Sequence, residues 1–84
     1  MQYEPYLTPF FTKQAEKLKK KDRILYERVM KKIEQIIEQP EHYKPLSGPL
    51  AGKRRVHLDP FVIVYEIQGN VVVFNYVKHH DKAY

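Results

Sequence analysis

Three polar residues alternate with apolar ones in the second half of the sequence and could do acid–base chemistry together. Arg55, His57 and Asp59 are each separated by one residue, so they share a face if they lie on a regular β-strand. Histidine exchanges protons near neutral pH, and arginine can hold a phosphate through two donors. An exposed strand with ordinary polar residues shows the same pattern, so the spacing alone leaves both interpretations open.

A second polar group lies between Val77 and Tyr84, and it contains two adjacent histidines, His79 and His80. If the last strand ends near Val77, this segment can fold over the face that carries His57, and His80 then supplies a second proton carrier. Tyr84 could stack on a base or bond a phosphate. A solvated, frayed terminus is the alternative. Adjacent strand residues point to opposite faces, so we expect no metal site and no cofactor here.

Basic residues are also concentrated on the segment from Lys13 to Lys32, which holds nine lysines and arginines against three acidic residues. Such a run can track the phosphates of a nucleic acid, and it is equally typical of a solvated helix face. The whole chain has 15 basic and 10 acidic residues, a formal charge of +5. That balance favours a polyanionic partner.

Two helices must form the first half of the structure. Thr8 and Pro9 are typical of a helix start, Asp22 can cap a second helix, and Pro40 ends it. Helices joined this tightly form a hairpin. Apolar residues recur at helical spacing on both segments, namely Phe11, Ala15 and Leu18, then Leu25, Val29, Ile33, Ile36 and Ile37.

The last third predicts an antiparallel sheet that carries the polar residues. Strands are expected at residues 53–58, 61–67 and 71–77, with a short edge strand at 3–7 and a loop rich in Pro and Gly at 39–52. Period-two alternation turns Val56 and Leu58 toward the helices and leaves Arg55 and His57 on the other face. The predicted core comprises Leu25, Val29, Ile33, Ile36, Phe61, Ile63 and Tyr65.

Length and composition limit the class of protein. A chain of 84 residues fits one domain, residues 1–84, and 43% hydrophobic residues argue against full disorder. The absence of cysteine excludes a disulfide or thiolate–zinc framework. The longest apolar run is far shorter than the about 20 residues of a membrane span, and the N-terminus shows no signal peptide. We therefore expect a cytoplasmic protein.

Motifs along the whole chain resemble the RelE/YoeB/YafQ toxins of type II toxin–antitoxin systems. They are the loop Pro-Leu-Ser-Gly-Pro-Leu-Ala-Gly at 45–52, the strand Phe-Val-Ile-Val-Tyr-Glu-Ile at 61–67 and the ending from Val77 to Tyr84. The strand and turn at 55–60 look most like the YafQ branch. The resemblance implies an α+β fold in which an N-terminal strand and a helical hairpin pack on one face of a small antiparallel sheet.

The resemblance also implies an activity, that of an mRNA interferase neutralised by a cognate antitoxin. Such toxins cut mRNA in the ribosomal A site without a metal, through attack of the ribose 2′-OH on the adjacent phosphate. His57 then matches the base, His80 the acid, Arg55 a strand cation and Tyr84 the terminal aromatic residue. Asp59 stands one residue before the position of the branch's acidic residue. The expected RNA-binding residues are Lys44, Lys53, Arg54, Lys78 and His79.

The related ParE toxins provide the alternative. They share the fold and act on DNA gyrase, so fold alone does not decide between the two activities. Many RelE members carry an arginine where this chain has Val62. The pair of His57 and His80 favours RNA cleavage over gyrase poisoning.

Overall fold

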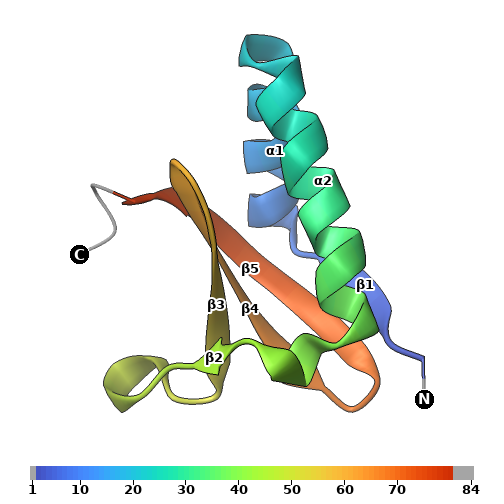
Figure 1. Cartoon of the computed structure of the whole chain (residues 1–84), viewed down its shortest axis with the longest axis vertical. Helices are drawn as coiled ribbons and strands as arrows, with labels where there is room; N and C mark the ends of the chain where they lie inside the picture. Colours follow the sequence, from blue (N-terminus) through green and yellow to red (C-terminus); the bar gives the residue numbers. More distant parts are fainter. Residues whose placement is uncertain (1, 81–84) are drawn as a thin grey trace.

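Two helices cover one face of a five-stranded sheet in the computed structural model, which describes residues 2–80 (Figure 1). The elements are β1 (Glu4–Leu7), α1 (Pro9–Lys21), α2 (Arg23–Glu38), η1 (Pro40–His42), β2 (Lys44–Pro45), η2 (Gly48–Leu50), β3 (Lys53–Leu58), β4 (Phe61–Gln68) and β5 (Val71–His79). This is the predicted α+β architecture. None of the helices in the described residues is long and apolar enough to cross a membrane.

The two α-helices begin where the sequence predicts. Pro9 is the first residue of α1, and the Thr8 hydroxyl accepts a hydrogen bond from the N–H of Phe11 at 3.1 Å. The Asp22 carboxylate caps α2 in the same way, accepting from the N–H of Leu25 at 3.1 Å. Because these oxygens satisfy N–H groups that a first helical turn leaves unpaired, adjacent residues determine both helix starts.

The sheet is mixed, which corrects the predicted antiparallel topology. Its strand order is β1-β5-β4-β3-β2, and β1 runs parallel to β5 while the other neighbours are antiparallel. Parallel neighbours need a long crossover, and here the helical hairpin and three strands lie between them in the chain. The predicted edge strand is thus present. It contains Pro5, whose missing N–H is tolerated at an edge.

The core lies between the helical hairpin and the sheet. Its buried cluster comprises Phe11, Val29, Ile33, Ile36, Val56, Ile63, Tyr65, Val72 and Phe74. Leu25 and Phe61 are only half-buried, which corrects two predicted core positions. Leu25 lies near the start of α2, where the hairpin projects past the sheet (Figure 1). Phe61 lines a groove beside α1.

A bulge in β5 decides which of its side chains turn away from the helices. The pairing of β4 with β5 joins Val64 to Tyr76 but Tyr65 to Phe74, so Asn75 is an extra residue. Strict alternation from the buried Phe74 would turn Tyr76 toward the helices. Because Asn75 interrupts the alternation, Tyr76 shares the face of Val64, away from the helices.

Candidate active site on the open face of the sheet

Two rows of side chains lie on the face of the sheet turned away from the helices, which we call the open face. Cross-strand pairing forms one row from Lys44, Arg55, Val64 and Tyr76, and a second row from His57, Val62 and Lys78. Val62 and Val64 are 1% and 4% exposed. The open face therefore has an apolar floor covered by cationic and aromatic side chains.

His57 and His80 lie side by side at one end of the open face. Their ring centroids are 5.1 Å apart, the ring planes are inclined by 50°, and both residues are exposed. The backbone N–H of His80 donates to the carbonyl of Pro60 at 2.6 Å, in the turn between β3 and β4. This bond holds the residue after β5 beside the end of β3. β5 itself ends at His79, two residues beyond the end predicted at Val77.

Cations flank the two histidines along both rows. Arg55 precedes His57 by two residues on β3, and Lys44 lies directly opposite Arg55 on β2. Lys78 occupies the row of His57 and precedes His80 by two residues. Two proton carriers beside positive charge suit cleavage of a phosphodiester without a metal, because protons then move at two oxygens while negative charge builds on the phosphate oxygens.

Tyr76 is a candidate site residue that the sequence analysis missed. It is half-buried beside Val64 in the first row, with Arg55 on the other side of Val64, and the ammonium group of Lys78 lies 5.6 Å from its ring centroid. An aromatic ring next to cations suits a nucleobase, which can stack on it. The signal available in the sequence is that Phe74 and Val77 are both apolar. In a regular strand, residues three apart point to opposite faces, so Phe74 and Val77 can both face the core only if one extra residue interrupts the alternation between them.

Two of the predicted RNA-binding cations make contacts within the protein. Arg54 pairs with the core residue Tyr65, on the helix side of the sheet, and donates to the carbonyls of Tyr43 at 2.7 Å and Glu41 at 3.2 Å. The structure therefore does not bring Arg54 to the histidines. Its bonds instead hold the segment between α2 and β2 against β3.

Lys53 lies on the open face but belongs to a polar cluster at the end remote from the histidines. Its ammonium group contacts Glu66 Oε1 at 2.6 Å and Asn75 Oδ1 at 3.2 Å. The hydrogen bond from Lys53, followed by that from Gln68, lowers the pKa of Glu66 from its ordinary value. Lys53 thus has a charge partner already.

The remaining predicted site residues are placed differently. Asp59 is exposed in the turn after β3, so the strand does not run far enough for it to share a face with His57 by alternation. His79 pairs with Phe61 and packs edge-on against its ring at 5.8 Å, on the side of the sheet opposite His57. Tyr84 lies outside the described residues.

Comparisons with known proteins agree with this fold. The family model described as the ParE toxin of type II toxin–antitoxin systems, parDE, matches residues 6–84. A Methanocaldococcus jannaschii protein, provisionally named toxin RelE4, is 39% identical over 85 residues, covering 98% of this chain and 90% of that protein.

Solved structures match over nearly the whole chain as well. A chain of the Mycobacterium tuberculosis toxin–antitoxin complex RelBE2 superposes with a TM-score of 0.83 at 22% identity, covering 94% of this chain and 99% of that chain. YafQ of Escherichia coli superposes with a TM-score of 0.64 at 19% identity, covering 95% and 96%. These structural likenesses show the fold, and the family match and the archaeal relative show the lineage. The chain belongs to the RelE/ParE superfamily of type II toxins.

Proposed function

We propose that this toxin is a metal-independent endoribonuclease that cleaves mRNA on the ribosome, and that His57 and His80 are its proton-transfer pair. The observation that supports this proposal is the meeting of the two histidine rings, 5.1 Å apart, on a cationic face. They come from β3 and from the residue after β5, and the bond from His80 to Pro60 holds them together. A gyrase-binding surface has no need of two adjacent proton carriers.

In the proposed reaction, neutral His57 takes the proton of the ribose 2′-OH, and the 2′-oxygen attacks the adjacent phosphorus. The bond from phosphorus to the 5′-oxygen breaks, and protonated His80 gives its proton to that leaving oxygen. The products are a 2′,3′-cyclic phosphate and a 5′-OH. Arg55, with Lys44 beside it, neutralises the charge that builds on the phosphate oxygens. The roles of base and acid follow the family resemblance.

A cognate antitoxin and a cytoplasmic setting belong to the same proposal. The similar M. tuberculosis chain comes from a toxin–antitoxin complex. A free ribonuclease that cuts mRNA would stop the growth of the cell that makes it, so its open face has to be covered until cleavage is needed. The ribosome-bound substrate also fits a basic chain, because ribosomal RNA presents a dense array of phosphates.

The test is cleavage of mRNA by variants in which each histidine is replaced in turn. His57→Ala and His80→Ala should each lower the rate by about 10²–10⁴-fold, the usual contribution of a positioned acid or base. His42→Ala is the matched control, since His42 is exposed in η1 and contacts Tyr43 rather than the open face. It should keep full activity. Circular dichroism checks that all three variants fold.

The site of cutting separates the two candidate activities. Induced expression followed by mapping of mRNA 5′ ends should show cuts in phase with ribosomes. Intact mRNA with damaged DNA would instead identify a gyrase poison. Full activity of both histidine variants would contradict the acid–base assignment.

A further inference from the structure

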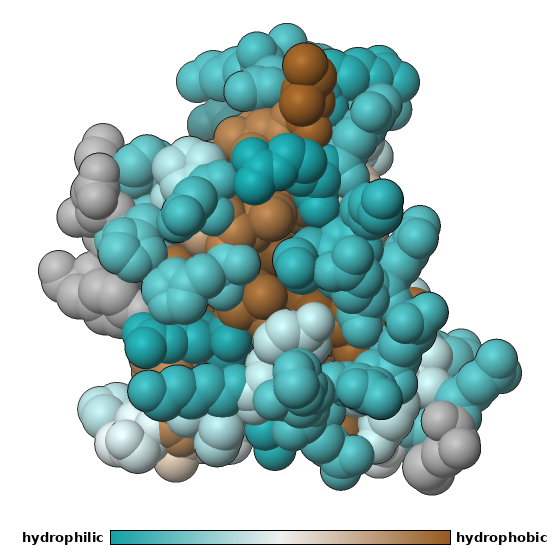
Figure 2. Space-filling model, in the orientation of Figure 1, coloured by the Kyte–Doolittle hydropathy of each residue, from teal (hydrophilic) through white to brown (hydrophobic). Residues whose placement is uncertain are grey.

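A large groove lies on the other side of the sheet from the two histidines. It is a groove of about 620 Å³ between α1 and the strands β4 and β5. Its apolar lining includes Val29, Phe61 and Val77. Figure 2 shows an apolar strip between the helical hairpin and the sheet, bordered on both sides by hydrophilic side chains. None of the proposed catalytic groups lines this groove, so cleavage does not account for it.

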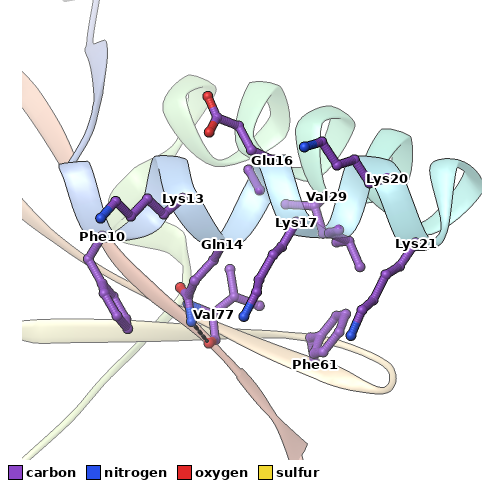
Figure 3. A pocket seen from close by; sticks show the side chains of 12 residues that line it. Phe10, Lys13, Gln14, Glu16, Lys17, Lys20, Lys21, Val29, Phe61 and Val77 are labelled. Atoms are coloured by element: carbon purple, nitrogen blue, oxygen red, sulfur yellow. Dashed lines mark hydrogen bonds between the residues drawn. The ribbon is translucent and has the colours of Figure 1, made fainter.

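The groove is held open by a fixed contact between α1 and β5. The Gln14 side chain donates to the carbonyl of Val77 at 2.8 Å and accepts from the N–H of the same residue at 2.7 Å (Figure 3). Two bonds to one backbone unit behave like a rung of the sheet. The spacing between helix and strand is therefore set by the structure before any ligand binds.

Lysines line the groove at regular intervals along α1. Lys13, Lys17 and Lys21 are four residues apart, and a rise of 1.5 Å per residue separates them by about 6 Å along one side of the helix. Figure 3 shows Lys17 and Lys21 reaching from the helix toward the strands, with Lys21 next to Phe61. Together with Lys20, four lysines line the groove against one acidic residue, Glu16. An evenly spaced row of cations suits a chain of evenly spaced phosphates.

Aromatic rings stand at the groove as well. Phe10 is 60% exposed although it is a large apolar residue. Phe61 lines the groove and is half-buried, with the ring of His79 packed against it at 5.8 Å. Grooves that hold single-stranded nucleic acid combine cations for the backbone with aromatic rings on which bases stack. This groove carries both.

One residue that lines the groove is next in sequence to the turn that holds His80. Phe61 directly follows Pro60, whose carbonyl accepts the bond from His80. Only the two-residue turn of Asp59 and Pro60 separates His57 and Leu58 in sequence from Phe61. RNA bound on the open face can leave it at this end of the β3–β4 hairpin, and the cations and aromatic rings of the groove lie beyond that end.

We propose that the groove between α1 and the β4–β5 strands binds single-stranded RNA that continues from the cleavage site, with Lys17 and Lys21 holding its phosphates. This inference rests on the proposed ribonuclease function. An acidic amphipathic segment of a protein could contact the same lysines. We favour RNA because a strand bound at the histidines has further nucleotides that lie close to the groove, whereas a protein segment has no such link to the histidine site. A second copy of this chain is disfavoured because lysines would face lysines.

The experiment measures binding of RNA oligonucleotides that are 2′-O-methylated throughout, so that no 2′-OH is available and cleavage cannot occur. Oligonucleotides of about 4 and about 12 nucleotides span the site sizes typical of single-strand binding proteins. The long one should bind more tightly and with a steeper salt dependence than the short one. Each lost phosphate contact lowers the slope of log K against log salt by about 0.7, so K17Q/K21Q should lower it by about 1.4.

A matched double variant controls for the loss of two charges. K19Q/K31Q removes exposed lysines of α1 and α2 that do not line the groove. It should keep the slope of the wild type on the long oligonucleotide. Phe10→Ala should weaken binding of the long oligonucleotide while leaving its salt slope unchanged, because stacking involves no counterion release. The short oligonucleotide should bind to all of these variants with the affinity that it has for the wild type.

Two outcomes would overturn the inference. The first is K17Q/K21Q behaving like K19Q/K31Q on the long oligonucleotide. The second is K17E/K21E binding RNA normally while escaping neutralisation by the co-expressed antitoxin, which would make the occupant a protein. His57→Ala keeps the two proposals separable, since K17Q/K21Q should lower the salt slope on the long oligonucleotide by about 1.4 in that background as well. If that variant still cleaves unmodified mRNA, the acid–base proposal fails while the groove result stands.

Discussion

Arg54 and Arg55 are adjacent in the chain but lie on opposite faces of β3. Arg55 lies on the open face in the row of Lys44 and Tyr76. Arg54 lies on the helix side and donates to two backbone carbonyls of the preceding loop. The two guanidinium groups are chemically the same, so their roles differ only through the alternation of the strand.

This contrast predicts that replacement by alanine affects RNA cleavage at Arg55 and stability at Arg54. Arg55→Ala should lower RNA cleavage by about 10²-fold, as loss of a positioned charge donor does. Arg54→Ala should lower the free energy of unfolding by about 2 kcal/mol, because charge-assisted bonds to carbonyls are lost. Urea denaturation and a cleavage assay measure both. Loss of activity in Arg54→Ala at unchanged stability would place that residue at the substrate instead.

Glu66 predicts a pH dependence of stability. The bond from Lys53 lowers its pKa below the ordinary value of 4.5, so the folded state favours the carboxylate. The contribution of the Glu66 carboxylate to the free energy of unfolding is therefore complete above pH 4.5. It is lost as the pH falls below 4.5 through the folded-state pKa. Glu66→Gln should lower the free energy of unfolding at neutral pH by roughly 1 kcal/mol.

The difference between wild type and Glu66→Gln should shrink when both are unfolded in acid. The exposed Glu34→Gln on α2 provides the control, with no change expected at either pH. A difference between wild type and Glu66→Gln that stays constant from neutral to acidic pH would show that the charge of Glu66 does not stabilise the fold.

Among the elements, the helices could be predicted from the sequence and β5 could be predicted only in part. Thr8 and Asp22 act on the backbone within three residues, so local patterns suffice for both helix starts. The pairing of β1 with β5 joins segments at opposite ends of the fold, and no local pattern reports it. Packing against a partner strand, and not propensity, selects such a neighbour.

In the candidate site, too, one part follows from local sequence and another depends on pairing with a distant strand. Alternation in β3 predicts the face of His57, since Val56 is buried beside it. The face of His80 depends on the bulge at Asn75, because strict alternation from Phe74 would turn it toward the helices. A bulge adjusts one strand to its partner, so it is decided by β4 as well as by β5. The sequence predicts His80 on this face through a strand that ends near Val77, whereas β5 runs to His79 and the bulge turns His80 to that face.

The bulge predicts which single-residue deletions β5 tolerates. Removing Asn75 leaves Phe74 and Tyr76 adjacent, opposite Tyr65 and Val64, so every pairing of β5 with β4 can persist. That deletion should fold and keep cleavage within about tenfold of the wild type, less than the loss of one catalytic group. Growth arrest on induction and an RNA cleavage assay measure the outcome.

Deletion of Val77 from the same strand is the matched control. It lies beyond the bulge, so its removal turns Lys78 and His80 to the helix side and should abolish cleavage. If the Asn75 deletion is as inactive as the Val77 deletion, the bulge does more than set the faces of the side chains that follow it.

Across the whole molecule, positive charge is arranged in two regions that meet at one turn. The open face carries Lys44, Arg55 and Lys78, and the groove beside α1 carries its row of lysines. Both regions border the turn of Asp59 and Pro60. The basic residues are therefore gathered on two surfaces of the sheet, and the proposed RNA path crosses from one surface to the other at this turn.

The position of β5 has a consequence for the order in which the molecule assembles. β5 is the last strand in the chain, yet it lies between β1 and β4 in the sheet. While the chain is being synthesised, β1 has no partner, and the helices have only part of the surface that they later cover. Contacts this distant in sequence form late and together. His80 follows β5 directly, so the proposed histidine pair forms only once the strand that joins β1 to β4 is in place.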